Sequence, residues 1–148
     1  LVYSTTKSNK DFIKLLLKIK ENFIVYGFDK NVTINNIKFK KISDVPFTKD
    51  FVVCKAVIGT GGFNLISECM FLKKPMLTIP VKNRYEQTIN ALHLERLGYG
   101  MYSKNINKKV IEKFIGKIPK YRNKLKNSKK YNNKEALRKI SDAIKSLS

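Results

Sequence analysis

Short apolar blocks alternate along the chain with longer segments in which apolar residues recur every three or four positions. The short blocks are rich in β-branched and aromatic residues, and they predict strands at residues 1–5, 23–26, 37–39, 56–58, 76–79 and 99–102. The longer segments predict amphipathic helices at residues 9–20, 47–54, 64–73 and 86–97. Because strands and helices follow one another in turn, we predict a Rossmann-like α/β fold, with a parallel sheet flanked by helices.

The last third of the chain is basic and less regular. Two helices are predicted near residues 108–117 and 134–146, and a polar, lysine-rich connector at residues 117–134 separates them. A length of 148 residues, 43% of them hydrophobic, suits one domain with its own core. We therefore predict a single domain over residues 1–148 that includes the basic connector and a C-terminal helix.

The formal net charge of +20 raises the question of an anionic partner. The lysines are spread over every segment and arginines are few, whereas nucleic-acid-binding domains more often concentrate arginine and aromatic residues on one element. We therefore expect a compositional bias and a solvated connector, and we do not expect nucleic acid as the partner. A contact of residues 117–134 with an anionic membrane surface stays open as the alternative.

No apolar run is long enough to span a bilayer, and the first residues show no pattern typical of a secretory signal. Cys54 and Cys69 lie at no metal-ligand spacing, so we interpret them as reduced thiols in the core. Together these features predict a cytoplasmic protein, peripheral at most at the inner face of the membrane. Because the chain begins without methionine and inside an apolar stretch, we expect it to be cut from a longer protein.

The turn after the strand at residues 56–58 carries candidate chemistry. Residues 57–68 read Val-Ile-Gly-Thr-Gly-Gly-Phe-Asn-Leu-Ile-Ser-Glu. Gly61 and Gly62 permit positive φ angles and leave no Cβ between the backbone and a ligand. The helix that follows offers free N–H groups and the positive end of its dipole, which suits a diphosphate. A plain tight turn between a strand and a helix uses glycine in the same way, so that interpretation stays open.

Polar side chains on the two following helices extend this candidate site. The carboxylate of Glu68, about one turn into its helix, could accept hydrogen bonds from both hydroxyls of a ribose. Glu86 and Asn90 are four positions apart and share one helix face, with Gln87 beside them, which suits recognition of sugar hydroxyls. The alternatives are an ordinary glutamate favoured by the helix dipole and a solvated helix start.

These motifs together resemble the C-terminal domain of GT-B glycosyltransferases, and most nearly the group of the bacterial peptidoglycan N-acetylglucosaminyltransferase (family 28) and its archaeal relatives. The resemblance rests on residues 56–68, on Leu-Lys-Lys-Pro-Met-Leu-Thr-Ile-Pro at 72–80, on Glu-Gln-Thr-Ile-Asn-Ala at 86–91 and on Leu-Glu-Arg-Leu-Gly-Tyr-Gly at 94–100. UDP-glucuronosyltransferases resemble the chain more distantly. The order of strands and helices extends the likeness over nearly the whole chain.

The resemblance implies a UDP-sugar donor and inverting transfer to an acceptor, which an absent N-terminal domain or a partner subunit would hold. It implies no metal and no cofactor. The residues that it places at the donor are Gly61, Gly62, Phe63, Asn64 and Leu65 at the diphosphate, Glu68 at the ribose, Glu86, Gln87 and Asn90 at the sugar, Ser43 in the loop that meets the uracil, and Thr5 in the first phosphate loop.

Some positions depart from the family pattern. Thr60 stands where many relatives carry histidine, Glu86 stands where the peptidoglycan enzyme has glutamine, and Thr5 lies where the family often has Gly-Ser. The identity of the sugar therefore stays open. The catalytic base would come from the absent half, and we interpret His93, the only histidine, as a surface residue.

Other classes of function remain as alternatives. Non-hydrolysing UDP-GlcNAc 2-epimerases share this architecture and a similar glycine turn, although the motif at residues 86–90 fits transferases better. A non-catalytic donor subunit of a split transferase would explain the missing half. A nucleic-acid-binding module would rest on charge alone.

Overall fold

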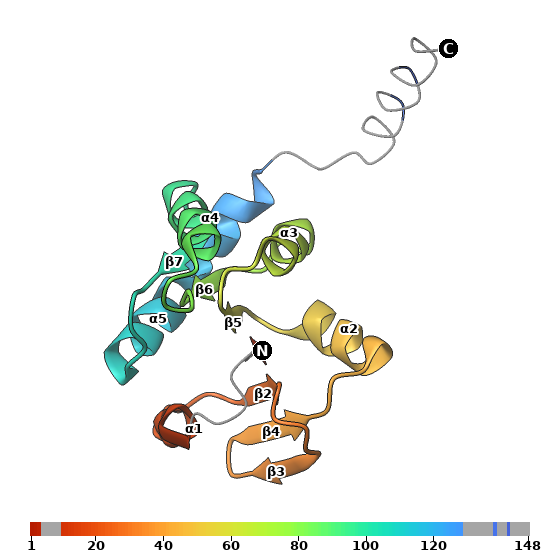
Figure 1. Ribbon diagram of the computed structural model, residues 1–148, viewed down its shortest axis with the longest axis vertical. Helices are drawn as coiled ribbons and strands as arrows, with labels where there is room; N and C mark the ends of the chain where they lie inside the picture. Colours follow the sequence, from red (N-terminus) through yellow and green to blue (C-terminus); the bar gives the residue numbers. More distant parts are fainter. Residues whose placement is uncertain (4–9, 129–137, 139–141, 143–148) are drawn as a thin grey trace.

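A computed structural model describes residues 1–3, 10–128, 138 and 142. The strands are β1 (Val2–Tyr3), β2 (Phe23–Tyr26), β3 (Val32–Ile34), β4 (Ile37–Lys40), β5 (Val57–Gly59), β6 (Met76–Thr78) and β7 (Gly100–Tyr102). The helices are α1 (Lys10–Leu17), α2 (Asp44–Val53), α3 (Phe63–Phe71), α4 (Tyr85–Arg96) and α5 (Lys108–Lys126). The described strands form one sheet in the order β3-β4-β2-β1-β5-β6-β7 (Figure 1).

The predicted α/β fold is confirmed. Every neighbouring pair of strands is parallel except β3 with β4. From β1 the chain builds the sheet outward through β2 and β4, and it then returns to the other side of β1 with β5. The strand order therefore reverses between β1 and β5, and in sheets of this kind ligands bind beyond the carboxyl ends of the strands at such a reversal.

Helices cover both faces of the sheet (Figure 1). α1 and α5 pack in one core cluster with Ile58 and Leu77, whereas α2, α3 and α4 pack in a second cluster with Val57 and Met76. Adjacent residues of β5 and β6 thus face opposite layers, as expected from the two-residue period of a strand. The groove described below lies on the face of α2, α3 and α4.

The edge strand β3 was not predicted from the sequence. Its residues, Val-Thr-Ile, are β-branched and alternate apolar and polar positions, but the run is only three residues long, lies between Asn31 and Asn35, and is exposed throughout. Turn-forming residues therefore dominate this part of the sequence. It pairs antiparallel with β4 across a tight turn in which Asn35 adopts a φ of 49°. The sheet is therefore mixed at this edge, as is common in folds with an otherwise parallel sheet.

The predicted connector at residues 117–134 is wrong in its first part, because α5 continues to Lys126. Ile118 and Tyr121 pack in the core cluster that includes the sheet, and Leu125 is also buried, so the apolar stripe continues. This burial outweighs the helix-breaking tendency of Pro119. The rest of that segment from residue 129, Thr5, and all of the predicted C-terminal helix except residues 138 and 142 lie outside the described residues. Within the described part of the chain, no helix combines the length and the apolar character needed to cross a membrane.

Asn36 holds the chain after α1 against the β3–β4 turn. Its Nδ2 donates to the carbonyl oxygens of Leu16, Ile19 and Glu21 at 3.1, 2.9 and 2.8 Å. Leu16 lies in the last turn of α1, and its carbonyl also accepts from the N–H of Ile19 at 3.1 Å, whereas Ile19 and Glu21 follow the helix. One side-chain amide therefore joins three backbone groups at and after the end of α1 to the tight turn between β3 and β4.

We expect Asn36→Ala to lower the free energy of unfolding by about 1–3 kcal/mol, because the partly buried carbonyls of Ile19 and Glu21 lose this donor. Urea denaturation followed by circular dichroism measures this change. Asn22→Ala is the control: Asn22 is exposed, and its substitution is expected to change stability by less than about 0.5 kcal/mol. Equal stability of the two variants would contradict this role of Asn36.

Candidate functional site

The Gly61-Gly62 turn joins β5 to α3 at the point where the strand order reverses. Gly61 adopts a φ of 86°, and a Cβ there would lie 3.0 Å from the backbone oxygen of Gln87. Gly62 has φ −61° and ψ 141°, and a Cβ built on it would meet nothing within 4 Å. Of the two glycines, only Gly61 therefore adopts a positive φ, whereas Gly62 leaves open space where a Cβ would lie.

Gly62 is also the N-cap of α3, and it has no side chain to bond the first turn. The first bond within the helix runs from the N–H of Ile66 to the carbonyl of Gly62 at 3.1 Å. The amides of the preceding residues, Phe63, Asn64 and Leu65, have no partner within the helix. Together with the helix dipole, they make the opening of α3 suitable for a phosphate group.

Side chains near the start of α4 brace the glycine turn. Asn90 Nδ2 makes long hydrogen bonds to the carbonyl of Gly61 at 3.4 Å and to Glu86 Oε1 at 3.5 Å. Gln87 Oε1 accepts a hydrogen bond from the backbone N–H of Val81 at 3.0 Å, which fixes the loop between β6 and α4. The two motifs that the sequence placed at one site therefore meet, and the exposed carboxylate of Glu86 remains beside them.

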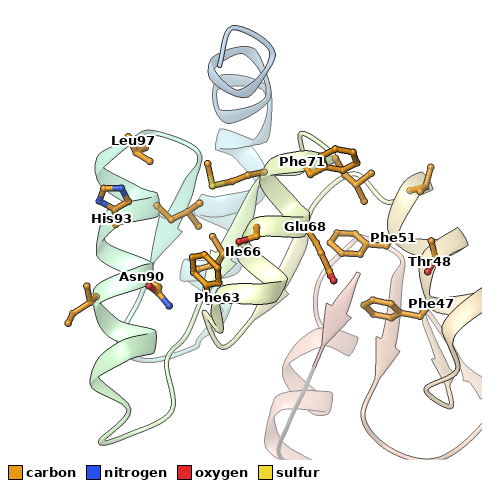
Figure 2. A pocket seen from close by; sticks show the side chains of 16 residues that line it. Phe47, Thr48, Phe51, Phe63, Ile66, Glu68, Phe71, Asn90, His93 and Leu97 are labelled. Atoms are coloured by element: carbon orange, nitrogen blue, oxygen red, sulfur yellow. The ribbon is translucent and has the colours of Figure 1, made fainter. Parts of the chain in front are cut away.

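A groove of about 1150 Å³ runs along α3, and side chains of α2, α3 and α4 line it. Figure 2 shows Glu68 pointing from α3 toward α2, where the rings of Phe47 and Phe51 form the facing wall. Phe63 and Asn90 line the groove on the α4 side. Because Phe63 follows Gly62 directly, the phosphate-suited turn adjoins this groove, and Glu68 stands one to two turns further along.

The remaining predicted residues take different positions. Ser43 is the exposed N-cap of α2, in extended conformation and without a side-chain cap bond. Asn64 is exposed, whereas Leu65 is half-buried and lies where a Cβ on Gly59 would be, at 2.7 Å. His93 is exposed on the α4 side of the groove, as expected of a surface residue. The structure thus places Ser43 at the start of the helix that forms the groove wall.

Sequence reasoning missed the aromatic wall and the group that holds it. Asp50 of α2 accepts hydrogen bonds from Tyr26 Oη and Lys40 Nζ, both at 2.6 Å, and these residues end β2 and β4. Only 13% of the Asp50 side chain is exposed, so the ion pair with Lys40 is well shielded from water. These bonds attach α2, with Phe47 and Phe51, to the carboxyl edge of the sheet.

The Asp50 cluster shifts two pKa values in opposite directions. Burial raises the pKa of the Asp50 carboxyl, but the hydrogen bonds from Lys40 and Tyr26 outweigh it and hold the pKa below its usual value. Burial and the hydrogen bond to the Asp50 carboxylate raise the pKa of Tyr26 well above its usual value. The cluster is therefore formed by a charged Asp50 and a neutral Tyr26 over the whole neutral range.

We expect Asp50→Asn to lower stability at neutral pH by about 1–3 kcal/mol, because Lys40 loses its charged partner. Since the folded pKa of Asp50 is depressed, its contribution is complete above its usual pKa near 4 and is lost as pH falls through the lower, folded pKa. Thermal unfolding between pH 7 and pH 2 should therefore show a shallower acid decline for Asp50→Asn than for the wild type. Asp11→Asn, at an exposed residue, should keep the wild-type slope.

No group of three histidine, cysteine, aspartate or glutamate side chains among the described residues could hold a metal ion. Of the two cysteines, Cys69 is buried and Cys54 half-buried, and neither forms a disulfide. The polar groups described around the glycine turn are backbone amides, the carboxylates of Glu68 and Glu86, and the side-chain amides of Gln87 and Asn90.

Comparison with known proteins identifies the family. A match to glycosyl transferase family 1 covers residues 1–119, which include the whole sheet, the glycine turn and both polar motifs. The chain belongs to glycosyl transferase family 1.

Two curated relatives of this family member have names that differ only in their final number. A protein of Bacillus cereus named UDP-N-acetylglucosamine–N-acetylmuramyl-(pentapeptide) pyrophosphoryl-undecaprenol N-acetylglucosamine transferase 2 is 35% identical over 106 residues. The aligned part is 68% of this chain and 29% of the relative. A protein of Bacillus thuringiensis, with the same name but numbered 3, is 34% identical over 107 residues. That alignment also covers 68% of this chain and 29% of the relative. The chain thus spans less than a third of the curated relatives it matches.

Solved structures show that this glycosyl transferase family 1 chain has the fold of one part of larger GT-B enzymes. The glycosyltransferase of kitacinnamycin has a TM-score of 0.66 at 15% identity, covering 84% of this chain and 36% of the other. The glycosyltransferase SnogD of Streptomyces nogalater has a TM-score of 0.59 at 14% identity, covering 85% and 37%. At such identities the likeness establishes the fold only.

Proposed function

We propose that this chain is the donor-binding half of a UDP-sugar-dependent hexosyl or N-acetylhexosaminyl transferase. The observation that carries the proposal is the Gly61-Gly62 turn, which opens α3 at the strand reversal with free space above Gly62 and Glu68 further along the same helix. Family membership supports this role, because the curated relatives are named for transfer from UDP-N-acetylglucosamine. The relatives' additional length supports an acceptor-binding half on another domain or a partner chain.

In this proposal the donor lies along the carboxyl edge of the sheet. The amides of Gly62, Phe63, Asn64 and Leu65 bind the diphosphate, whose negative charge the α3 dipole stabilises. Glu68 accepts hydrogen bonds from the ribose hydroxyls, and the base reaches toward the start of α2, where Ser43 and the Phe47 wall lie. The sugar then faces Glu86, Gln87 and Asn90 at the start of α4.

The proposed reaction is inverting and independent of a metal. An acceptor hydroxyl attacks the anomeric carbon from the face opposite the departing UDP, and a base in the acceptor-binding half takes its proton. This chain contributes by orienting the donor and by stabilising the negative charge that develops on UDP with the α3 amides. It needs no cofactor in this scheme. Such an enzyme would act in the cytoplasm, peripherally at a membrane when its acceptor is lipid-linked.

Calorimetric titration of the chain with UDP, UDP-N-acetylglucosamine and UDP-glucose tests this proposal directly. We expect saturable binding of UDP, with NMR shift changes concentrated at Gly62, Glu68 and Gln87. A higher affinity for one of the two sugar nucleotides would identify the donor. A folded chain that binds none of the three nucleotides would contradict the proposed function.

A further inference from the structure

The outer side of α5 carries a row of five lysines: Lys109, Lys113, Lys117, Lys120 and Lys124. Their spacing of four, four, three and four residues keeps them on one side of the helix. All five are exposed, and the opposite side of α5 is buried through Ile111, Phe114 and Leu125. At 1.5 Å per residue the row is about 22 Å long.

No ion pair within the described part of the chain involves any of these five lysines. The one acidic residue of α5, Glu112, pairs with Lys108 outside the row, at 3.6 Å. Like charges four residues apart on a helix repel one another and lower its stability. The buried side explains why the helix forms, but no ion pair among the described residues compensates the repulsion in this row.

The chemistry of the row favours a surface with many separate anions. A single phosphate would engage one or two of the ammonium groups, whereas the row extends over several lipid headgroups. The exposed side of α5 carries no aromatic residue, because Phe114 and Tyr121 are buried, so it offers no platform on which nucleic-acid bases could stack. Lysine, as a point charge without fork geometry, suits this kind of diffuse attraction.

We propose that the lysine row of α5 binds an anionic membrane surface. The choice of a membrane over a nucleic acid also rests on the proposed function, because the relatives' names include pyrophosphoryl-undecaprenol, a lipid. α5 lies on the sheet face that it shares with α1, whereas the groove lies on the face of α2, α3 and α4. Docking through α5 therefore leaves the donor groove uncovered.

Sedimentation with phosphatidylcholine vesicles containing about one-third phosphatidylglycerol tests the proposal without nucleotide or acceptor. One variant replaces Lys109, Lys113, Lys117, Lys120 and Lys124 with glutamine. Its matched control replaces five exposed lysines on other elements and loops, Lys20, Lys38, Lys49, Lys82 and Lys104, also with glutamine. Glutamine is nearly as good a helix former as lysine, so the row variant should stay folded, which circular dichroism checks.

We expect the wild type to bind these vesicles, to bind pure phosphatidylcholine weakly and to be released by high salt. At about fivefold per lysine, the row variant should lose at least about a hundredfold in vesicle affinity, and the control less than about tenfold. Equal losses in the two variants would overturn the proposal in favour of a diffuse charge effect. Tighter, salt-sensitive binding of duplex DNA by the same row would overturn it in favour of nucleic acid. UDP titration of the row variant keeps this outcome separate from the proposed function, because its UDP affinity should be unchanged.

Discussion

Gly62→Val is expected to abolish UDP binding while the protein stays folded. The φ of −61° at Gly62 is accessible to valine, and the first atom of a side chain there meets nothing within 4 Å. A valine should therefore cost less than about 1 kcal/mol of stability, mainly through a poorer helix cap. Its methyl groups would occupy the space proposed for the diphosphate, and calorimetry should show a loss of about a hundredfold or more, equivalent to about 3 kcal/mol.

Gly61→Val is the matched comparison at the neighbouring position. Its φ of 86° strains any residue with a Cβ, and that Cβ would press against the Gln87 carbonyl at 3.0 Å. We expect a loss of stability of about 2 kcal/mol or more, visible as a lower unfolding temperature. A Gly62→Val variant that binds UDP normally would remove the diphosphate from this turn, whereas equal destabilisation of both variants would contradict the different roles assigned to the two glycines.

Glu68→Ala is expected to weaken UDP binding about ten- to hundredfold, because hydrogen bonds to a charged group contribute about 1.5–3 kcal/mol. The side chain is exposed in the groove, so the substitution should change the free energy of unfolding by less than about 0.5 kcal/mol. Glu112→Ala removes an exposed carboxylate from α5 and serves as a control for net charge.

The ribose assignment of Glu68 can be separated from a general electrostatic effect. The wild type should bind 2′,3′-dideoxy-UDP more weakly than UDP, because the hydroxyls that Glu68 would bond are missing. In Glu68→Ala the two nucleotides should bind almost equally. If the variant still discriminates between them as the wild type does, Glu68 does not contact the ribose.

Much of this fold follows from local sequence patterns, and the exceptions have physical reasons. β2 was predicted at its observed bounds because Phe23–Tyr26 is a compact run of β-formers whose inward residues are buried. β3 could not be predicted because its run of three β-branched residues is short and lies between Asn31 and Asn35, which favour turns. The sequence predicts the end of α5 too early, because the lysines and Pro119 after residue 117 are typical of a connector. In the folded chain, packing of the apolar residues of α5 against the sheet keeps the segment helical to Lys126.

Part of the candidate site could also be predicted from local sequence patterns, and part of it could not. The glycine turn and the motif of Glu86, Gln87 and Asn90 could be found because glycine pairs and helical spacing are visible along the chain. The Asp50 cluster joins three elements through residues up to 24 positions apart, and the aromatic wall depends on how α2 is rotated. Such contacts depend on tertiary packing, which local patterns do not encode. Thr5 lies outside the described residues, so its assignment stays a prediction.

The bond from Asn90 to the Gly61 carbonyl has a consequence for how this site could change during evolution or redesign. It joins the helix proposed to select the sugar to the turn proposed to hold the phosphates, across 29 positions of sequence. A substitution at the start of α4 that favours a different sugar would also shift this carbonyl. The affinity of the turn for the diphosphate of every nucleotide would then change as well. Donor preference and nucleotide affinity would therefore vary together, and new specificities should arise most readily by routes that retain Asn90.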